Sequence, residues 1–109
     1  MKALQKFLAM LIVLTMLMGT QPVSIAHAAI TLTVTKLADT NDGICDSDCS
    51  LREAVTSASG GDTITFDPSL AGGTITLTSQ IVLDKDLTLD GSGLSPHVQV
   101  SGGNVTRVF

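Results

Sequence analysis

Polar and apolar residues alternate in several short stretches of this 109-residue chain. The first covers residues 30–35 and reads Ile-Thr-Leu-Thr-Val-Thr. A period of two is typical of a strand with one buried face. The pattern therefore predicts that Ile30, Leu32 and Val34 face the interior and that the intervening threonines face solvent.

Four later stretches share one polar–apolar–polar–apolar form. Their first apolar residues are separated by 11, 12 and 11 positions, with turn segments between them. Such a pitch also fits a sandwich or barrel, but recurrence of one motif favours stacked coils. If two strands make one coil, Leu87 repeats the place of Ile64 in the next coil. Val98 likewise repeats the place of Ile75, and a fifth copy begins near Thr106. The four stretches are Thr63–Phe66, Thr74–Leu77, Asp86–Leu89 and His97–Val100.

One short helix is predicted, over residues 50–59. Ser50 is a favourable N-cap, and Glu53 three residues later completes a capping box. Gly60 and Gly61 follow and are expected to end the helix. A helix of this length is not stable alone, so its apolar stripe must pack on the rest of the chain. The stripe has the spacing i, i+3, i+4 and i+7 and consists of Leu51, Ala54, Val55 and Ala58.

Residues 1–28 have the three parts of a secretory signal peptide. Two lysines give a basic start, and a run of twelve residues follows that is apolar except for one threonine. Ala26 and Ala28 then satisfy the small-x-small rule for cleavage before Ala29. The apolar run is much shorter than the roughly 20 residues of a membrane span. We therefore expect an exported protein without a membrane span in the mature chain, from which His27 is removed with the leader.

Export changes the interpretation of Cys45 and Cys49. In an oxidising compartment, two cysteines in a short chain favour a pair over free thiols, and their three-residue separation lets a turn bring them into bonding range. Closing so small a loop stabilises by roughly 2 kcal/mol and fixes the approach to the helix. The alternative is a metal pair, but two thiolates lack the further ligands that zinc requires. The sequence favours the disulfide.

Charge and composition exclude some classes of partner. Two of the six basic residues lie in the leader and all ten acidic residues follow it, so the mature chain carries about −6. This charge argues against nucleic acid, whose binding depends on basic groups that displace counterions. Only 3% of residues are aromatic, with no Trp or Tyr, which argues against a stacking platform for bases. A divalent cation is the more plausible partner.

The polar loop before the helix is the best candidate for a ligand site. Calcium prefers oxygen ligands in a flexible loop, although the spacing here does not fit an EF-hand. The alternative is a solvated acidic loop whose aspartates cap turns and favour the helix N-terminus. The candidate calcium ligands are Asp39, Asn41, Asp42, Asp46 and Asp48.

Other polar residues give weaker signals. Asp84, Asp86 and Asp90 have one parity and could share the outer face of a sheet. We expect Arg52 to pair with the acidic loop or the neighbouring helix start, with the small gain of an exposed ion pair. His97 is expected to face solvent. No paired acid and base is identifiable, so the residues indicate no catalytic site.

The segment Cys-Ser-Leu-Arg-Glu-Ala-Val at residues 49–55 resembles the CSLREA domain, found near the N-terminus of exported bacterial proteins. Matching stretches at residues 33–36, 39–43, 61–66 and 87–91 extend the resemblance over essentially the whole mature chain. The resemblance implies that a right-handed parallel β-helix follows, usually in a long secreted or surface protein of adhesin-like type. It implies no catalytic residues. The family normally continues well beyond the two or three coils expected here.

We therefore predict a mainly β chain with three parts. They are a signal peptide (residues 1–28), a capping segment of strand, disulfide loop and helix (29–61), and the first coils of a right-handed parallel β-helix (62–109), truncated at the C-terminus. The first coil of a stack exposes an apolar end and free strand edges, which a helix with a polar back would cover.

The expected function is that of a non-catalytic cap of a secreted or cell-surface β-helix protein, in adhesion or surface display. The expected partners are downstream coils of the same polypeptide and a host or matrix surface or a polysaccharide. The alternative is the start of a β-helix polysaccharide lyase or hydrolase, with its active site in downstream coils. Conserved-looking Asp, Arg and Lys clusters on one face of those coils would favour the enzyme.

The disulfide interpretation can be tested by thiol titration of the exported protein. Without reductant, a thiol reagent added to the unfolded chain should modify neither Cys45 nor Cys49, whereas prior reduction should expose both. Two reactive thiols in the unreduced protein would refute the pair.

Overall fold

The computed structural model describes residues 21–109, so most of the predicted signal peptide lies outside the described residues. Residues 21–30 have no secondary structure and are exposed. No helix between residues 21 and 109 is long and apolar enough to cross a bilayer.

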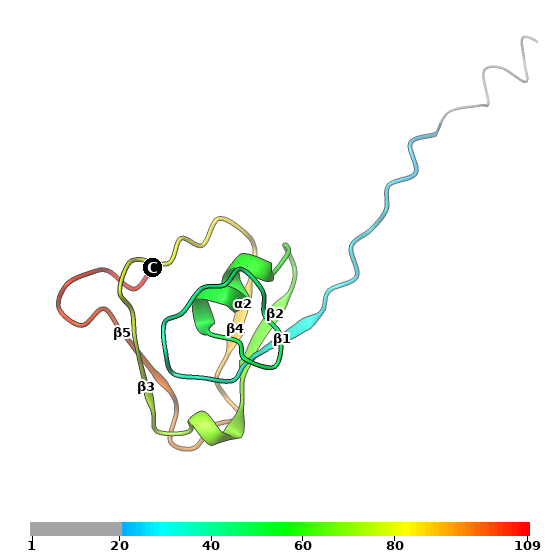
Figure 1. The fold of residues 1–109 in the computed structure, drawn as a ribbon. Coiled ribbons are helices and arrows are strands. Elements are labelled where there is room, and N and C mark those ends of the chain that lie inside the picture. The colour runs from blue at the N-terminus through cyan, green and yellow to red at the C-terminus, as the bar shows by residue number, and fades with distance from the viewer. Residues whose placement is uncertain (1–20) are drawn as a thin grey trace, which may run out of the picture.

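The described chain consists of short parallel strands and one short α-helix (Figure 1). One sheet has the strand order β1-β2-β4 and the other has the order β3-β5. The elements are β1 (Thr31–Val34), α2 (Leu51–Ser57), β2 (Thr63–Phe66), the 3₁₀ helix η1 (Pro68–Leu70), β3 (Thr74–Thr76), β4 (Thr88–Asp90) and β5 (Gln99–Ser101). The prediction of a mainly β fold with one helix is confirmed.

Parallel pairing brings strands far apart in the sequence side by side. Ile64 of β2 pairs with Leu89 of β4, and Ile75 of β3 pairs with Val100 of β5. The predicted repeat, which made Leu87 equivalent to Ile64, is therefore wrong by two positions in both pairs. Because a shift of two preserves side-chain parity, the predicted inward face is unchanged. Strand β4 begins at Thr88, two residues later than the predicted stretch.

Besides the pairing of strands, one backbone hydrogen bond joins the residues after β5 to the residues between β3 and β4. The N–H of Ile81 donates to the carbonyl of Val108 at 3.2 Å. Residue 81 lies in the segment that runs from β3 across to β4, which we call the 78–87 segment (Figure 1). The structure assigns no strand near Thr106, where a fifth copy of the motif was predicted, but residues 106–109 return to this segment.

The helix stripe forms much of a single apolar core. Leu51, Ala54, Val55 and Ala58 are all buried, as predicted, and they join residues from β1, β2, β3 and the 78–87 segment. The other buried members are Val34, Cys49, Ile64, Leu70, Ile75, Leu77 and Ile81.

The first strand is shorter than its pattern suggested. Val34 is buried and Leu32 is half-buried, but Ile30, predicted to face inward, is 50% exposed. Ile30 precedes β1, and the helix contacts the strand further along the chain. The inward pattern therefore starts only at Leu32.

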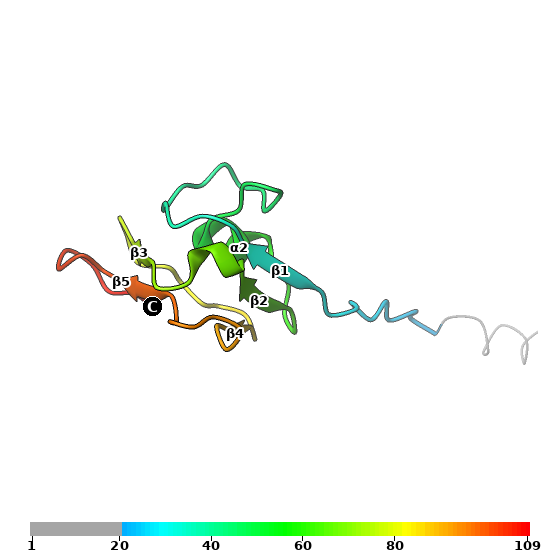
Figure 2. The same cartoon turned by 90° about the horizontal axis from the view of Figure 1, so that it is seen from below.

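The two ends of the stack differ. Seen from below, helix α2 and the loop before it lie on one side of the strands, and β4 and β5 lie on the other (Figure 2). Ile64, Ile75 and Leu77 near β2 and β3 are buried, whereas most apolar residues of the β4–β5 level are half-buried: Leu87, Leu89, Val98 and Val100. Leu94, between β4 and β5, is the buried exception. The core is therefore covered more fully at the helix end than at the opposite end.

Candidate functional site: the covered end of the stack

The N-terminus of α2 has the predicted capping box. Ser50 is extended (φ −79°, ψ 165°), and its Oγ accepts the N–H of Glu53 at 3.1 Å. In return, the Ser50 N–H donates to Glu53 Oε2 at 2.7 Å. Both residues are buried, so each backbone donor is satisfied away from water.

Glu53 also holds the preceding loop against the helix. Its Oε1 accepts the Thr40 hydroxyl at 3.2 Å and the Asp42 N–H at 3.1 Å, and Lys36 Nζ lies 3.8 Å from Oε2. The N–H of Ser50, with these further donors, holds the pKa of Glu53 below its ordinary value against the opposing effect of burial. The capping motif predicted the first contact, but no local signal in the sequence predicted the loop contacts.

Two interactions close the base of the loop, a disulfide and a pair of hydrogen bonds. Cys45 and Cys49 form the predicted disulfide, with Cα atoms 4.6 Å apart. Beside it, the Thr35 N–H donates to the Cys49 carbonyl at 2.8 Å, and the Cys49 N–H donates to Thr35 Oγ at 2.8 Å. The end of β1 is thus tied directly to the start of the helix.

Arg52 forms a two-pronged ion pair with Asp39. The Nε and Nη2 atoms donate to the two carboxylate oxygens at 2.8 Å each. The side chains are only 17% and 2% exposed, so the prediction of a merely exposed pair is wrong, although its partner in the acidic loop is confirmed. Thr78 adds its N–H at 2.7 Å and its hydroxyl at 2.8 Å to Asp39 Oδ2.

This pair joins three segments. Arg52 belongs to α2, Asp39 to the preceding loop, and Thr78 to the 78–87 segment, where Arg52 Nη2 also donates to the Ser79 carbonyl at 2.7 Å. Arg52 above all, with help from Thr78, lowers the pKa of Asp39 to about 2 against the effect of burial. Asp39 is therefore ionised throughout the neutral range.

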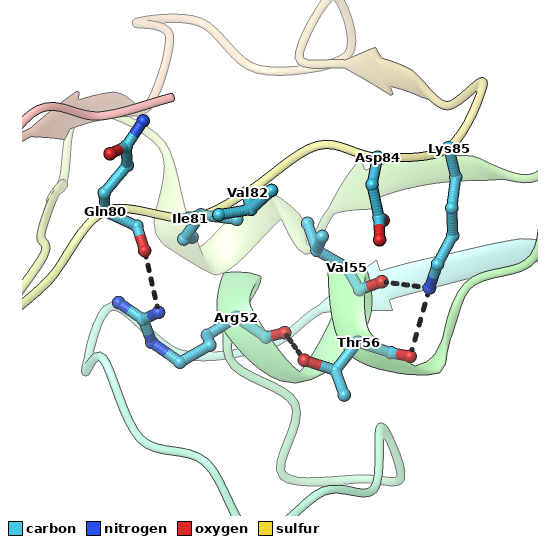
Figure 3. A pocket seen from close by; sticks show the side chains of 8 residues that line it. All are labelled: Arg52, Val55, Thr56, Gln80, Ile81, Val82, Asp84 and Lys85. Atoms are coloured by element: carbon cyan, nitrogen blue, oxygen red, sulfur yellow. Dashed lines mark hydrogen bonds between the residues drawn. The ribbon is translucent and has the colours of Figure 1, made fainter.

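Lys85 closes the other end of the helix. Its Nζ donates to the carbonyls of Val55 at 3.2 Å and Thr56 at 3.4 Å (Figure 3). It also donates to the Ala58 carbonyl at 2.7 Å. These carbonyls have no partner further along a helix, and a cation near them is also favoured by the helix dipole. The sequence around Lys85 gives no local signal of this role.

The helix ends earlier than predicted. It stops at Ser57, and Ala58 is an extended C-cap (φ −67°, ψ 148°), so the prediction of a helix to residue 59 ended by Gly60 and Gly61 is wrong. The Ser59 N–H turns away to Asp62 Oδ2 at 2.8 Å. Gly61 has φ +93° and serves instead in the turn into β2.

A pocket of about 350 Å³ lies between α2 and the 78–87 segment (Figure 3). Its two cations already donate to protein oxygens: Arg52 to Asp39 and Ser79, and Lys85 to the end of the helix. These groups join the helix to the segment rather than being left free to bind an anion. The pocket is lined by Arg52, Val55, Thr56, Gln80, Ile81, Val82, Asp84 and Lys85.

The structure does not assemble the predicted calcium site. Between residues 21 and 109, no group of three or more His, Cys, Asp or Glu side chains is placed to hold a metal ion. Asp39 pairs with Arg52, and Asp48 pairs with Lys36 at 3.0 Å. Three others accept an N–H two residues ahead, as turn residues do: Asn41 from Gly43, Asp42 from Ile44 and Asp46 from Asp48. The solvated-loop alternative describes these contacts.

The remaining candidates are Asp84, Asp86, Asp90 and His97, of which Asp84 lines the pocket. Asp84 and Asp86 are exposed in the 78–87 segment, and Asp90, at the end of β4, accepts the Ser92 N–H at 2.9 Å. The side chain of Ser92 above all, together with its N–H, holds the pKa of Asp90 below its ordinary value. His97 is exposed, as predicted, with Nδ1 3.2 Å from the Gly91 carbonyl.

Comparisons of the chain with models of protein families, with curated proteins and with solved structures find no match.

Replacing Asp39 by Asn should weaken the covered end and change its response to acid. A depressed pKa contributes stability that is present above about pH 4 and is lost as pH falls toward 2. We expect the variant to lose about 1–2 kcal/mol at pH 7, because the Asn amide nitrogen cannot accept a hydrogen bond, so one of the two bonds from Arg52 is lost and the other has no ionised acceptor. Its free energy of unfolding should also fall less steeply between pH 4 and 2.

Chemical denaturation across that pH range measures both effects. Asp46→Asn is the matched control, because Asp46 is exposed and accepts only a local N–H. Identical acid slopes for Asp39→Asn and the native chain would contradict the assignment.

Replacing Lys85 by Met should lower the free energy of unfolding by about 1–2 kcal/mol, because the helix carbonyls lose a charged donor. Arg107→Met is the control, since it removes the same charge from an exposed residue. Thermal unfolding followed by circular dichroism compares the two. Equal loss in both variants would show that charge alone, and not the helix cap, is responsible.

Proposed function

We propose that this chain is the N-terminal cap and first coils of an exported right-handed parallel β-helix protein that acts in adhesion or surface display. The observation that carries the proposal is the difference between the ends of the core. Helix α2 and its loop cover one end, whereas strands β4 and β5 lie at the other with only half-buried inward residues.

The covered end has the properties that a terminal cap requires. It buries an apolar stripe on the first strands and presents polar groups outward. Glu53 and the disulfide hold the loop, and Arg52 and Lys85 hold the 78–87 segment. A free first coil would otherwise offer an apolar end for association.

The opposite end has the properties of a site for further coils. β4 pairs only with β2, and β5 pairs only with β3, so each keeps one edge unpaired within the described chain. Both pairs are parallel and share one sequence interval, from Thr63 to Thr88 and from Thr74 to Gln99, which another level could continue. Downstream coils of the same polypeptide are therefore the partner that we propose for this end.

Export and surface display rest on the signal-peptide pattern, the disulfide and the resemblance to the CSLREA domain. A disulfide is compatible with an oxidising compartment. The acidic mature chain suits contact with a host or matrix surface or a polysaccharide better than contact with nucleic acid.

Adding one coil tests the proposed open end. A copy of residues 85–109 appended after Phe109 repeats β4 at the same interval that separates Thr63 from its partner Thr88. In stacked repeats, stability grows with each added interface. We expect the free energy of unfolding to rise by about 1–3 kcal/mol, since four half-buried aliphatic side chains become covered.

Denaturant unfolding and hydrogen exchange of the β4 and β5 amides are the measurements. The control extension has serine at the added copies of Leu87, Leu89, Val98 and Val100. If the apolar and serine extensions give the same stability and the same exchange rates, the end does not accept coils.

A further inference from the structure

The carboxylate of Asp62 is buried where three segments meet. Its side chain is 1% exposed. Oδ2 accepts the Ser59 N–H at 2.8 Å, just beyond the helix, and Oδ1 accepts the Ile30 N–H at 3.0 Å, just before β1. The N–H donors of Ile30 and Ser59 hold the pKa of Asp62 below its ordinary value. Asp62 is therefore an anion inside the fold.

The side-chain partner of this carboxylate is in the leader. His27 Nε2 lies 3.1 Å from Asp62 Oδ1. Cleavage between Ala28 and Ala29 would remove His27 and leave the buried anion without it. The carboxylate would keep the N–H donors of Ile30 and Ser59 but lose its side-chain neighbour, which leaves Oδ1 open to a cation.

The same cleavage creates a positively charged amino group one residue before Ile30, which already bonds to Asp62. The new α-amino group is on Ala29, next to Ile30, whose N–H already donates to Oδ1. Successive Cα atoms are only about 3.8 Å apart, and residues 21–30 are exposed and without secondary structure. A terminal amine has three donors and turns freely about its bond to Cα, so small movements would bring it to Oδ1.

We propose that Asp62 is the receptor for the mature N-terminus, whose α-ammonium replaces His27 when the leader is removed. This inference rests on the export included in the proposed function. An α-ammonium is mostly charged at neutral pH, whereas a histidine is charged only when protonated. The exchange gives the mature chain a lasting ion pair at the junction of β1, the end of α2 and the turn into β2.

The pair would couple processing to the strength of the cap. Asp62 holds Ile30 and Ser59 in the same place, so fixing its carboxylate fixes both the start of β1 and the end of the helix. Three charged residues, Asp84, Lys85 and Asp86, lie in the 78–87 segment, which contacts this junction through the last two. Lys85 is bonded to the Ala58 carbonyl, and Asp86 accepts the Gly61 N–H through its backbone carbonyl.

The experiment uses the protein secreted from its full-length precursor. N-terminal sequencing first identifies the cleavage point, and NMR titration of the ¹⁵N-labelled amine then gives its pKa. We expect a start at Ala29 and an amine pKa about one unit above the ordinary 7.7–8.0. Because this pKa is raised by folding, its contribution to stability is present below about pH 8 and is lost as pH rises toward 9.

Two variants separate the ion pair from general folding. Asp62→Asn removes the charge and should return the amine pKa to its ordinary value. Inserting Asn-Gln between Ala28 and Ala29 keeps Asp62 but moves the amine about 7 Å along the chain, and it should also abolish the shift. If the Asn variant does not fold, the insertion decides the question.

The outcomes distinguish this inference from the export proposal. A retained leader contradicts export and this inference together. A start at Ala29 with an ordinary amine pKa, or with the same raised pKa in the insertion variant, contradicts this inference alone.

Discussion

A seven-residue helix at the end of an apolar core is the constraint on which this structure depends. So short a helix has few internal hydrogen bonds, and most of its backbone donors and acceptors belong to its unpaired ends. Burying its stripe is favourable only if these groups find partners near the core. The capping box supplies partners at the N-terminus of the helix, and Lys85 supplies a donor for the carbonyls at its C-terminus.

The side chains that form these contacts also hold neighbouring segments of the chain against the helix. Glu53 and Arg52 point to the preceding loop, and Arg52 and Lys85 connect to the 78–87 segment. Each contact satisfies a helix group and fixes a distant segment at once. This double use explains how a chain with small sheets and no Trp or Tyr defines one end of its core.

Local signals in the sequence predicted the local parts of this arrangement. Ser50 and Glu53 form a box because their spacing suffices, and Cys45 and Cys49 pair within one turn of the chain. The alternation of polar and apolar residues identified the inward face of each strand. It could not distinguish two strand registers that differ by two residues, because both place the same side chains inward. The long-range polar contacts were not predictable in this way. Lys85 lies 27 residues from the carbonyl of Ala58, and nothing in its neighbourhood indicates that partner, since the contact exists only once the parallel strands have set the path of the chain.

The acidic loop resembled a calcium site for the same reason. Its composition was visible in the sequence, but the partners of Asp39 were not, because Thr78 lies 39 residues away. The fold assigns Asp39 to Arg52 and Thr78, and the remaining oxygens of the loop mostly hold its own turns. A cluster of carboxylates in a sequence therefore does not distinguish a metal site from a set of structural contacts.

The unequal ends of the core give the fold a direction. At the covered end, carboxylates and cations are paired with backbone groups and with each other, so little is left to recruit another copy. At the far end, strand edges continue in register and aliphatic side chains are half-buried. Under the proposed function, further coils would be added at β4 and β5 and stopped at α2. The paired charges around α2 would then hold the cap in one place by fixing its loop and the 78–87 segment.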